Sequence, residues 1–224
     1  MRFGARLGVL ILLSAAGSSG RFAGQVAGLP VRNAGIVTGI GLAADVGFPN
    51  AHSGKGTAFG ATGAVGLGPV GLTASVARWK PSGGDAVTSV GGTGNLRVFG
   101  GPLIPLAVTL QGGIGRFRQS TIEGGTLTSL HVPVGLGIGL TIPNPAFGIK
   151  PWIAPRLDLL HTSETGGSVT GTVGDTEVHF GISGGVDVSF LSGLSVRAMY
   201  DRVQAGPGAH PSVLSLGLGF RVGT

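Results

Sequence analysis

The sequence contains no cysteine, so it cannot build a disulfide framework, a thiolate nucleophile or a zinc–cysteine site. Charge is also scarce, because Asp, Glu, Lys and Arg make up 11% of the residues against roughly 25% in ordinary soluble domains. Glycine, in contrast, accounts for 46 of 224 residues. Each glycine costs a helix roughly 1 kcal/mol relative to alanine, which disfavours Rossmann, TIM-barrel and helical-bundle enzymes. The high apolar content of 42% also argues against intrinsic disorder.

No stretch of the chain has 18 apolar residues without interruption, so the sequence predicts no membrane-spanning helix. The first 20 residues have a different pattern, with Arg2 and Arg6 preceding a short apolar run, Leu7 to Ala16, and then small residues. This order is typical of a cleaved secretory signal peptide. We therefore expect residues 1–20 to direct export of the protein.

The remaining chain alternates between apolar and small or polar residues. In the segment 127–142, the even positions are mostly Leu, Ile and Val, whereas the odd positions are mostly Gly, Ser, His and Pro. Side chains of a strand point alternately to its two faces, so this segment is expected to be a strand with one apolar face. Nine further segments show the same period: 35–48, 56–68, 69–79, 86–99, 103–115, 147–161, 176–190, 193–203 and 211–222.

The connections between these segments alternate between short turns and longer loops, of which 162–175 is the longest. Most segments exceed the 9–11 residues with which a tilted strand crosses a bilayer. Short periplasmic turns, longer outer loops and an even strand number are typical of outer-membrane barrels. The sequence therefore predicts an all-β transmembrane antiparallel up-and-down β-barrel over 34–224. We expect ten strands, with eight as the alternative count, and a short periplasmic lead-in over 21–33.

A soluble β-sandwich or secreted barrel would alternate too. Its polar face, however, would meet water and carry many Lys, Glu, Thr and Gln side chains. Here the second face is mostly Gly, Ala, Ser and Thr with isolated ions, which suits the crowded interior of a small closed barrel. Six aromatic residues also fall on the apolar parity near the strand ends, as the interfacial girdles of a spanning barrel require: Phe48, Phe147, Phe180, Phe190, Tyr200 and Phe220.

The segment 193–202, GLSVRAMYDR, and the closing strand SVLSLGLGFRV resemble the last hairpin of small Gram-negative outer-membrane β-barrel proteins, the OmpA/OmpX-like class. The resemblance covers about 34–224 and lies in the pattern, since no motif identifies a subfamily. It implies an outer-membrane location, contact with outer-membrane lipid and lipopolysaccharide, and insertion by the barrel assembly machinery. Members of this class usually end on an aromatic residue, whereas here four residues follow Phe220.

Charged residues of both signs fall on the inward parity. Because an unpaired charge in a narrow, low-dielectric interior costs several kcal/mol, we expect them to pair in an ion network that fills the lumen. A polar path for small solutes is the alternative, although ten strands enclose too little space for wide, general diffusion. The candidate lumen residues are Asp45, Arg97, Lys150, Arg156, Asp158, Glu177, Asp187, Arg197, Asp201 and Arg221.

Some outer-membrane barrels are lipid- or peptide-modifying enzymes and need a His–acid pair or a Ser–His–acid set near the outer rim. His131 beside Ser129 and His179 beside Glu177 are the only weak candidates, because such pairs on a polar strand face are common by chance. The five histidines lack the spacing of metal ligands, and no phosphate-binding loop motif exists. We therefore expect no cofactor, no metal and, because basic residues do not cluster with stacking aromatics, no nucleic acid.

Three arginines fall on the outward parity at the loop end of their strands: Arg78, Arg116 and Arg202. A guanidinium near the membrane interface costs little and matches phosphate geometry, so these residues are candidates for contact with lipid phosphates. Taken together, the sequence indicates an outer-membrane barrel with a structural or envelope role, with or without a narrow polar pore. A small-solute channel and a lipid- or peptide-modifying enzyme are the alternative functions.

Overall fold

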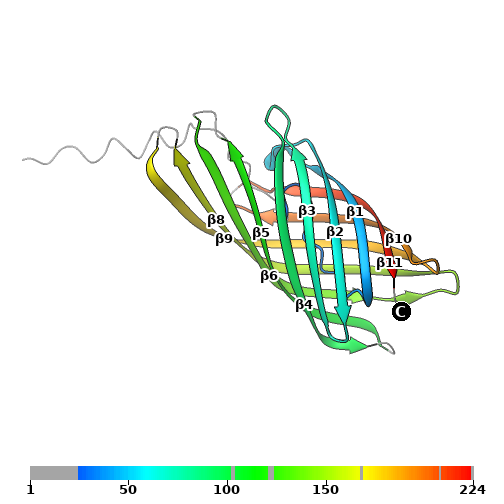
Figure 1. The fold of residues 1–224 in the computed structure, drawn as a ribbon. Coiled ribbons are helices and arrows are strands. Elements are labelled where there is room, and N and C mark those ends of the chain that lie inside the picture. The colour runs from blue at the N-terminus through cyan, green and yellow to red at the C-terminus, as the bar shows by residue number, and fades with distance from the viewer. Residues whose placement is uncertain (1–24, 102–103, 121–123, 167–168, 207, 223–224) are drawn as a thin grey trace, which may run out of the picture.

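A computed structural model describes residues 25–101, 104–120, 124–166, 169–206 and 208–222. These residues form an antiparallel β-barrel whose strands run obliquely around a common axis (Figure 1). The long strands are β1 (Gly39–Pro49), β2 (Thr57–Leu67), β3 (Val70–Lys80), β4 (Val87–Gly101), β5 (Ile104–Ser120), β6 (Thr126–Leu140), β8 (Phe147–Gly166), β9 (Val169–Phe190), β10 (Leu194–Gln204) and β11 (Ser212–Val222). The expected strand number of ten is confirmed.

Two short elements complete the fold. Strand β7 (Ile142–Pro143) continues β6 for two residues, and the 3₁₀-helix η2 (Ala51–Ser53) lies in the loop after β1. Among the described residues, no helix is long and apolar enough to cross a membrane.

The ring closes through one pairing that is distant in sequence, between β1 and β11. Each long strand pairs with the next long strand along the chain, and β6 pairs with β8 because the two-residue strand β7 pairs only with β8. A closed ring leaves no free strand edge, so each backbone polar group in the wall has a partner, as a bilayer requires. The short turns 67–70 and 190–194 lie at one end, here called the turn end, and the connections 49–57 and 80–87 lie at the other, the loop end.

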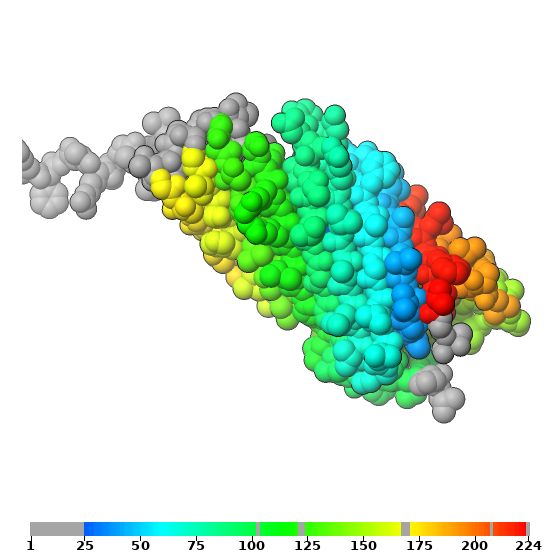
Figure 2. Space-filling view, viewed as in Figure 1, coloured from blue at the N-terminus to red at the C-terminus, as the bar shows by residue number. Residues whose placement is uncertain are grey.

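The alternation of the sequence becomes an inside-out distribution of side chains. Large apolar side chains cover the outer face over all ten long strands, and neighbouring strands pack into one continuous surface in the space-filling view (Figure 2). A contiguous apolar surface of this extent is not found on soluble monomers and suits contact with acyl chains. The most exposed members on successive strands include Leu42, Phe59, Leu72, Val90, Ile114, Val134, Leu157, Val178, Leu194 and Leu218.

One segment that the sequence predicted as a loop is largely strand in the structure. We expected 162–175 to be the longest loop, but β8 continues to Gly166 and β9 begins at Val169, so this stretch is a hairpin that extends beyond the other strands. The stretch is mostly Thr, Ser and Gly and has no strong apolar face, so its hydrophobicity pattern did not predict a strand. The proposed signal peptide, 1–20, lies outside the described residues.

The segment before the first strand differs most from expectation. Instead of leading to the barrel from outside, the described part of 21–33 lies in the lumen, and residues 25–37 run from the loop-end half of the interior to the turn end. Val31 and Ala27 are each 1% exposed. We call residues 25–37 the inner segment.

Inward-facing glycines make room for the inner segment. A Cβ atom at Gly66 would overlap the Val37 carbonyl, and one at Gly115 would overlap that of Gln25. The same holds where Gly47 faces Gly28. Glycine on the inner wall is therefore explained by close approach of a second backbone, which is a recognised reason for glycine within strands.

Apolar packing inside the barrel is concentrated around the inner segment. Near the loop end, Val26 and Leu29 pack in a buried cluster with Trp79 and Phe117. Nearer the turn end, Ala34 packs with Trp152 and Met199. These two buried clusters are close-packed apolar groups like those of a protein interior. They therefore form the core of the protein, inside the barrel.

Candidate functional site

Hydrogen bonds attach the inner segment to the wall at several levels. Gln25 Nε2 donates to the carbonyls of Gly92 and Ile114, the latter at 3.1 Å, and the Ala27 amide donates to Ser89 Oγ at 2.9 Å. Further down, Thr109 Oγ1 lies 2.7 Å from Asn33 Oδ1, to which it donates.

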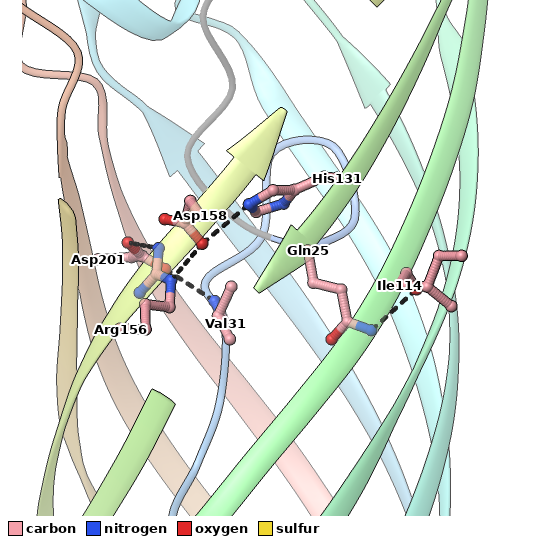
Figure 3. Close-up of polar contacts among 7 residues, drawn as sticks. All are labelled: Gln25, Val31, Ile114, His131, Arg156, Asp158 and Asp201. Atoms are coloured by element: carbon pink, nitrogen blue, oxygen red, sulfur yellow. Dashed lines mark hydrogen bonds and ion pairs between the residues drawn. The ribbon is translucent and has the colours of Figure 1, made fainter. Parts of the chain in front are cut away.

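The strongest attachment is a buried ionic cluster in the middle of the lumen (Figure 3). Arg156 Nε donates to Asp158 Oδ1 and Arg156 Nη2 donates to Asp201 Oδ1, both at 2.8 Å. The other oxygen of Asp201 accepts the Val31 amide at 2.8 Å, and His131 Nε2 lies 2.9 Å from Asp158 Oδ1. Asp201 lies on β10 and is fully buried. Its two carboxylate oxygens bind Arg156 of β8 and the Val31 amide, so it links both strands to the inner segment.

Glycine also makes this cluster sterically possible. Gly181 on β9 faces Arg156 in the register, and a Cβ atom there would lie 2.8 Å from the guanidinium carbon and overlap Asp158 Oδ2. Strand β9, which lies between β8 and β10, therefore has no side chain at Gly181, where it would collide with the ionic cluster.

A second set of charges lies one level toward the turn end, on a single row of the barrel. In the register, Lys150 is opposite Asp187, Asp187 is opposite Arg197, and Gly217 lies between Arg197 and Asp45. Across this glycine, Arg197 Nε donates to Asp45 Oδ1 at 2.7 Å. On the same row, Asp187 forms an ion pair with Arg32 of the inner segment.

The other candidate lumen residues are not joined to these clusters. Glu177 pairs with His179 at 2.8 Å on β9. Arg97 Nη2 donates to the Gly68 carbonyl of a turn at 2.9 Å. Within the described part of the chain, neither Lys150 nor Arg221 has a carboxylate within ion-pair distance.

Four residues of the inner segment that bind the barrel wall were not candidates from the sequence: Gln25, Val31, Arg32 and Asn33. They lie before the first alternating strand, in a stretch with no periodicity. The many inward glycines indicated free space or close approach of strands, but they did not identify which residues fill the lumen.

The arrangement around the two enzyme candidates does not favour access by a substrate. His131 is 5% exposed, and Ser129, which shares its face, is 2% exposed. His131 is also paired with Asp158. His179 is more open, but its partner is Glu177, and among the described residues no hydroxyl group forms a hydrogen bond with either member of the pair. No group of three or more potential metal ligands occurs in the parts of the chain that the structure describes.

The three outward arginines are exposed, but they do not form one site. Arg78 is opposite Thr88 on β4 and Arg116 is opposite Val90 on the same strand, so these two lie on either side of β4. Lys80 and Arg118 are exposed on the same outer face, which makes a basic patch on β3 and β5 at the loop end. Arg202, on β10, is separated from Arg78 by β11, β1 and β2.

Comparison with known proteins identifies the class through the fold alone. No family model matches the chain, and no curated protein matches it in sequence. Among solved structures, it is similar to the β domain of the Bordetella autotransporter BrkA, with a TM-score of 0.52, 15% identity, and coverage of 82% of this chain and all of that one.

Two further structures are similar at lower TM-scores. The translocator domain of the autotransporter NalP from Neisseria meningitidis has 16% identity, a TM-score of 0.45, and coverage of 82% of this chain and 89% of that one. The outer-membrane protease OmpT from Escherichia coli has 8% identity, a TM-score of 0.46, and coverage of 82% and 94%.

The protein thus has the fold of the outer-membrane β-barrels. Its apolar outer face, closed ring and ionic interior all agree with that class. In this protein, the lumen is filled by the residues that precede the first strand.

Proposed function

We propose that the protein is a non-conducting, non-enzymatic barrel of the outer membrane with a structural role in the envelope. The observation that carries this proposal is the inner segment, which occupies the lumen from the loop-end half to the turn end and is hydrogen-bonded to the wall on the way. A solute would have to displace these contacts, and a buried ion pair that loses a partner costs about 3–5 kcal/mol.

The alternative of a small-solute channel predicts a continuous aqueous path. Ten strands enclose a lumen between the filled eight-strand barrels and the wide sixteen-strand porins. Here two apolar clusters and the Arg156–Asp201 cluster fill the loop-end and middle sections around the inner segment. The space that stays open, about 180 Å³, runs along one side of the inner segment from the middle of the lumen to the turn end.

Planar-bilayer recording tests the proposal directly. The full-length mature protein, folded in detergent and shown to be heat-modifiable on a gel, is expected to insert without discrete conductance steps. A variant that lacks 25–36 is expected to conduct, because the glycines that face the segment would then line an open lumen. Regular single-channel steps from the intact protein would contradict the closed barrel.

We further propose that the basic patch formed by Arg78, Lys80, Arg116 and Arg118 contacts phosphates of the outer-leaflet lipid, in which lipopolysaccharide is the phosphate-rich component. Guanidinium groups suit phosphate geometry, and arginine near the interface costs only about 0–1 kcal/mol. Insertion would depend on the barrel assembly machinery, with β11 and its outward Phe220 as the closing strand.

A further inference from the structure

A cavity of about 180 Å³ runs along the inner segment from Gln25, Leu29 and Thr93 to the turn end, with β1, β2, β3, β10 and β11 forming most of its wall. This volume is roughly ten times what a single water molecule requires. The cavity is lined by four basic side chains and two carboxylates, so it has a formal excess of two positive charges: Arg32, Lys150, Arg197, Arg221, Asp45 and Asp187.

Both carboxylates already have arginine partners. Asp45 is bound by Arg197, and Asp187 is bound by Arg32. The excess positive charge therefore belongs to Lys150 and Arg221, which have no carboxylate within 4.0 Å among the described residues. An uncompensated charge in a low-dielectric lumen is costly, so this end of the barrel favours an anionic ligand.

The donors converge from different elements. Lys150 Nζ lies against the inner segment, where a Cβ atom on Gly35 would be only 3.0 Å from it. Arg32, on the same segment, has a buried Nε with no acceptor in the described structure. Arg221 lies at the end of β11 on the inward parity and is exposed at the rim.

From this geometry we infer that the turn-end part of this cavity is a binding site for a small oxyanion of the phosphate class. Its oxygens accept hydrogen bonds from Lys150 Nζ, the free Nε–H of Arg32 and the guanidinium of Arg221. The ligand enters from the turn end, because Arg221 is exposed there and the Arg156–Asp201 cluster blocks the way from the loop end. Binding neutralises the excess charge and links the inner segment to β8 and β11.

This site rests on the closed lumen proposed above, because Arg32 belongs to the inner segment. The two proposals nevertheless fail separately. If the intact protein conducts and still binds phosphate through Lys150, the closed barrel is wrong and the anion site stands. If it is silent in bilayers and binds no phosphate, only the anion site is wrong.

The test is a calorimetric titration of the full-length folded protein with inorganic phosphate, in a nonionic detergent that contains no phosphate. Ionic strength is held constant with sodium chloride so that general screening does not change. We expect saturable binding of one phosphate per barrel. Lys150→Gln should weaken this binding about tenfold or more, since it removes a charge-assisted hydrogen bond.

Lys55→Gln is the matched control, because it removes the same formal charge from an exposed residue of the loop after β1, outside both the cavity and the outer basic patch. It should leave the phosphate affinity unchanged. If Lys150→Gln does not fold, Arg221→Gln at the exposed rim provides the same test and should also weaken binding. Equal affinities in the lumen variant and in Lys55→Gln, or no binding beyond that of chloride, would overturn the inference.

A lipid headgroup carries the same phosphate oxygens, so a second titration separates the two sources. Micelles doped with phosphatidylglycerol should not compete with inorganic phosphate for the site, because a lipid phosphate cannot enter the lumen while its acyl chains stay on the outer face. Competition that depends on Lys150 would overturn the assignment to a free anion.

Discussion

The backbone amide of Val31 donates a hydrogen bond of 2.8 Å to the carboxylate of Asp201, although 170 residues separate the two positions. The same carboxylate binds Arg156 of β8 through its other oxygen. One fully buried side chain thus ties the inner segment to two strands of the wall.

Replacing Asp201 should therefore destabilise the barrel strongly. Asp201→Asn leaves Arg156 with one counter-charge in place of two, and we expect a loss of about 3 kcal/mol in the free energy of unfolding. Urea unfolding in detergent, followed by the heat-modifiability shift on a gel, measures this loss. Asp175→Asn changes an exposed carboxylate of the long hairpin and should stay within about 0.5 kcal/mol of the wild type. A similar stability for both variants would contradict the role of Asp201.

Adding a methyl group at Gly217 should disturb the ion pair between Asp45 and Arg197. In Gly217→Ala, the added Cβ would overlap Asp45 Oδ1 and lie 2.9 Å from Arg197 Nε, so the ion pair would have to shift. Overpacking of this kind costs about 1–3 kcal/mol.

The control for this variant is Gly112→Ala on β5. Gly112 has no atom of another residue within 4 Å of its Cβ position and faces outward. It should be close to neutral in the same unfolding assay. If Gly112→Ala destabilises as much as Gly217→Ala, the loss comes from glycine flexibility and not from the ion pair.

Because the chain contains no cysteine, its inner segment can be located by cross-linking without background. The double variant Ala27→Cys/Ser89→Cys should form a disulfide under mild oxidation, since the Ala27 amide lies 2.9 Å from Ser89 Oγ. Mass spectrometry of the linked peptides detects it.

Its control is Ala27→Cys/Val90→Cys, in which the second cysteine follows in sequence but faces the lipid. This pair should stay reduced, because the barrel wall separates the two thiols. Linkage of residue 90 at the same rate as residue 89, or no linkage of either, would place the segment outside the lumen.

The outer basic patch should affect stability in a lipid-dependent way. Arg78→Gln/Arg116→Gln should lower the melting temperature more in lipopolysaccharide-containing membranes than in phosphatidylcholine, because only the former offers dense phosphate. Arg202→Gln removes an outward arginine four strands away and should show a smaller difference between the two lipids. Adding it to make the triple variant should then change little. Equal losses in both lipids would count against the phosphate contact.

The strands could be predicted because their signal is local. In 127–142 the outward Leu, Ile and Val residues alternate with small inward ones, and this period of two holds in whichever barrel the strand is placed. The hairpin of β8 and β9 was missed beyond residue 161 because, past the apolar belt, its outer face no longer needs large apolar side chains.

For the interior, the sequence predicted which charged residues face inward but not how they pair. The inward parity identified the charges, but not that Arg156 binds Asp158 and Asp201 while Lys150 has no carboxylate partner. Which inward groups meet depends on the stagger between strands, since a shift of one pair changes every neighbour across the lumen. Arg32 could not be found at all, because it lies in a segment with no period.

The sequence by itself determined that this is a barrel with an apolar outside, since alternation is a property of each strand alone and hydrophobic burial in lipid follows from it. The structure decided between ten strands and eight. Only the tertiary structure decided that the lumen is filled by residues 25–37 and that positive charge collects at the turn end. Those features depend on contacts between residues more than 150 positions apart, such as Val31 with Asp201 and Arg32 with Asp187, which form only when the ring closes around the inner segment.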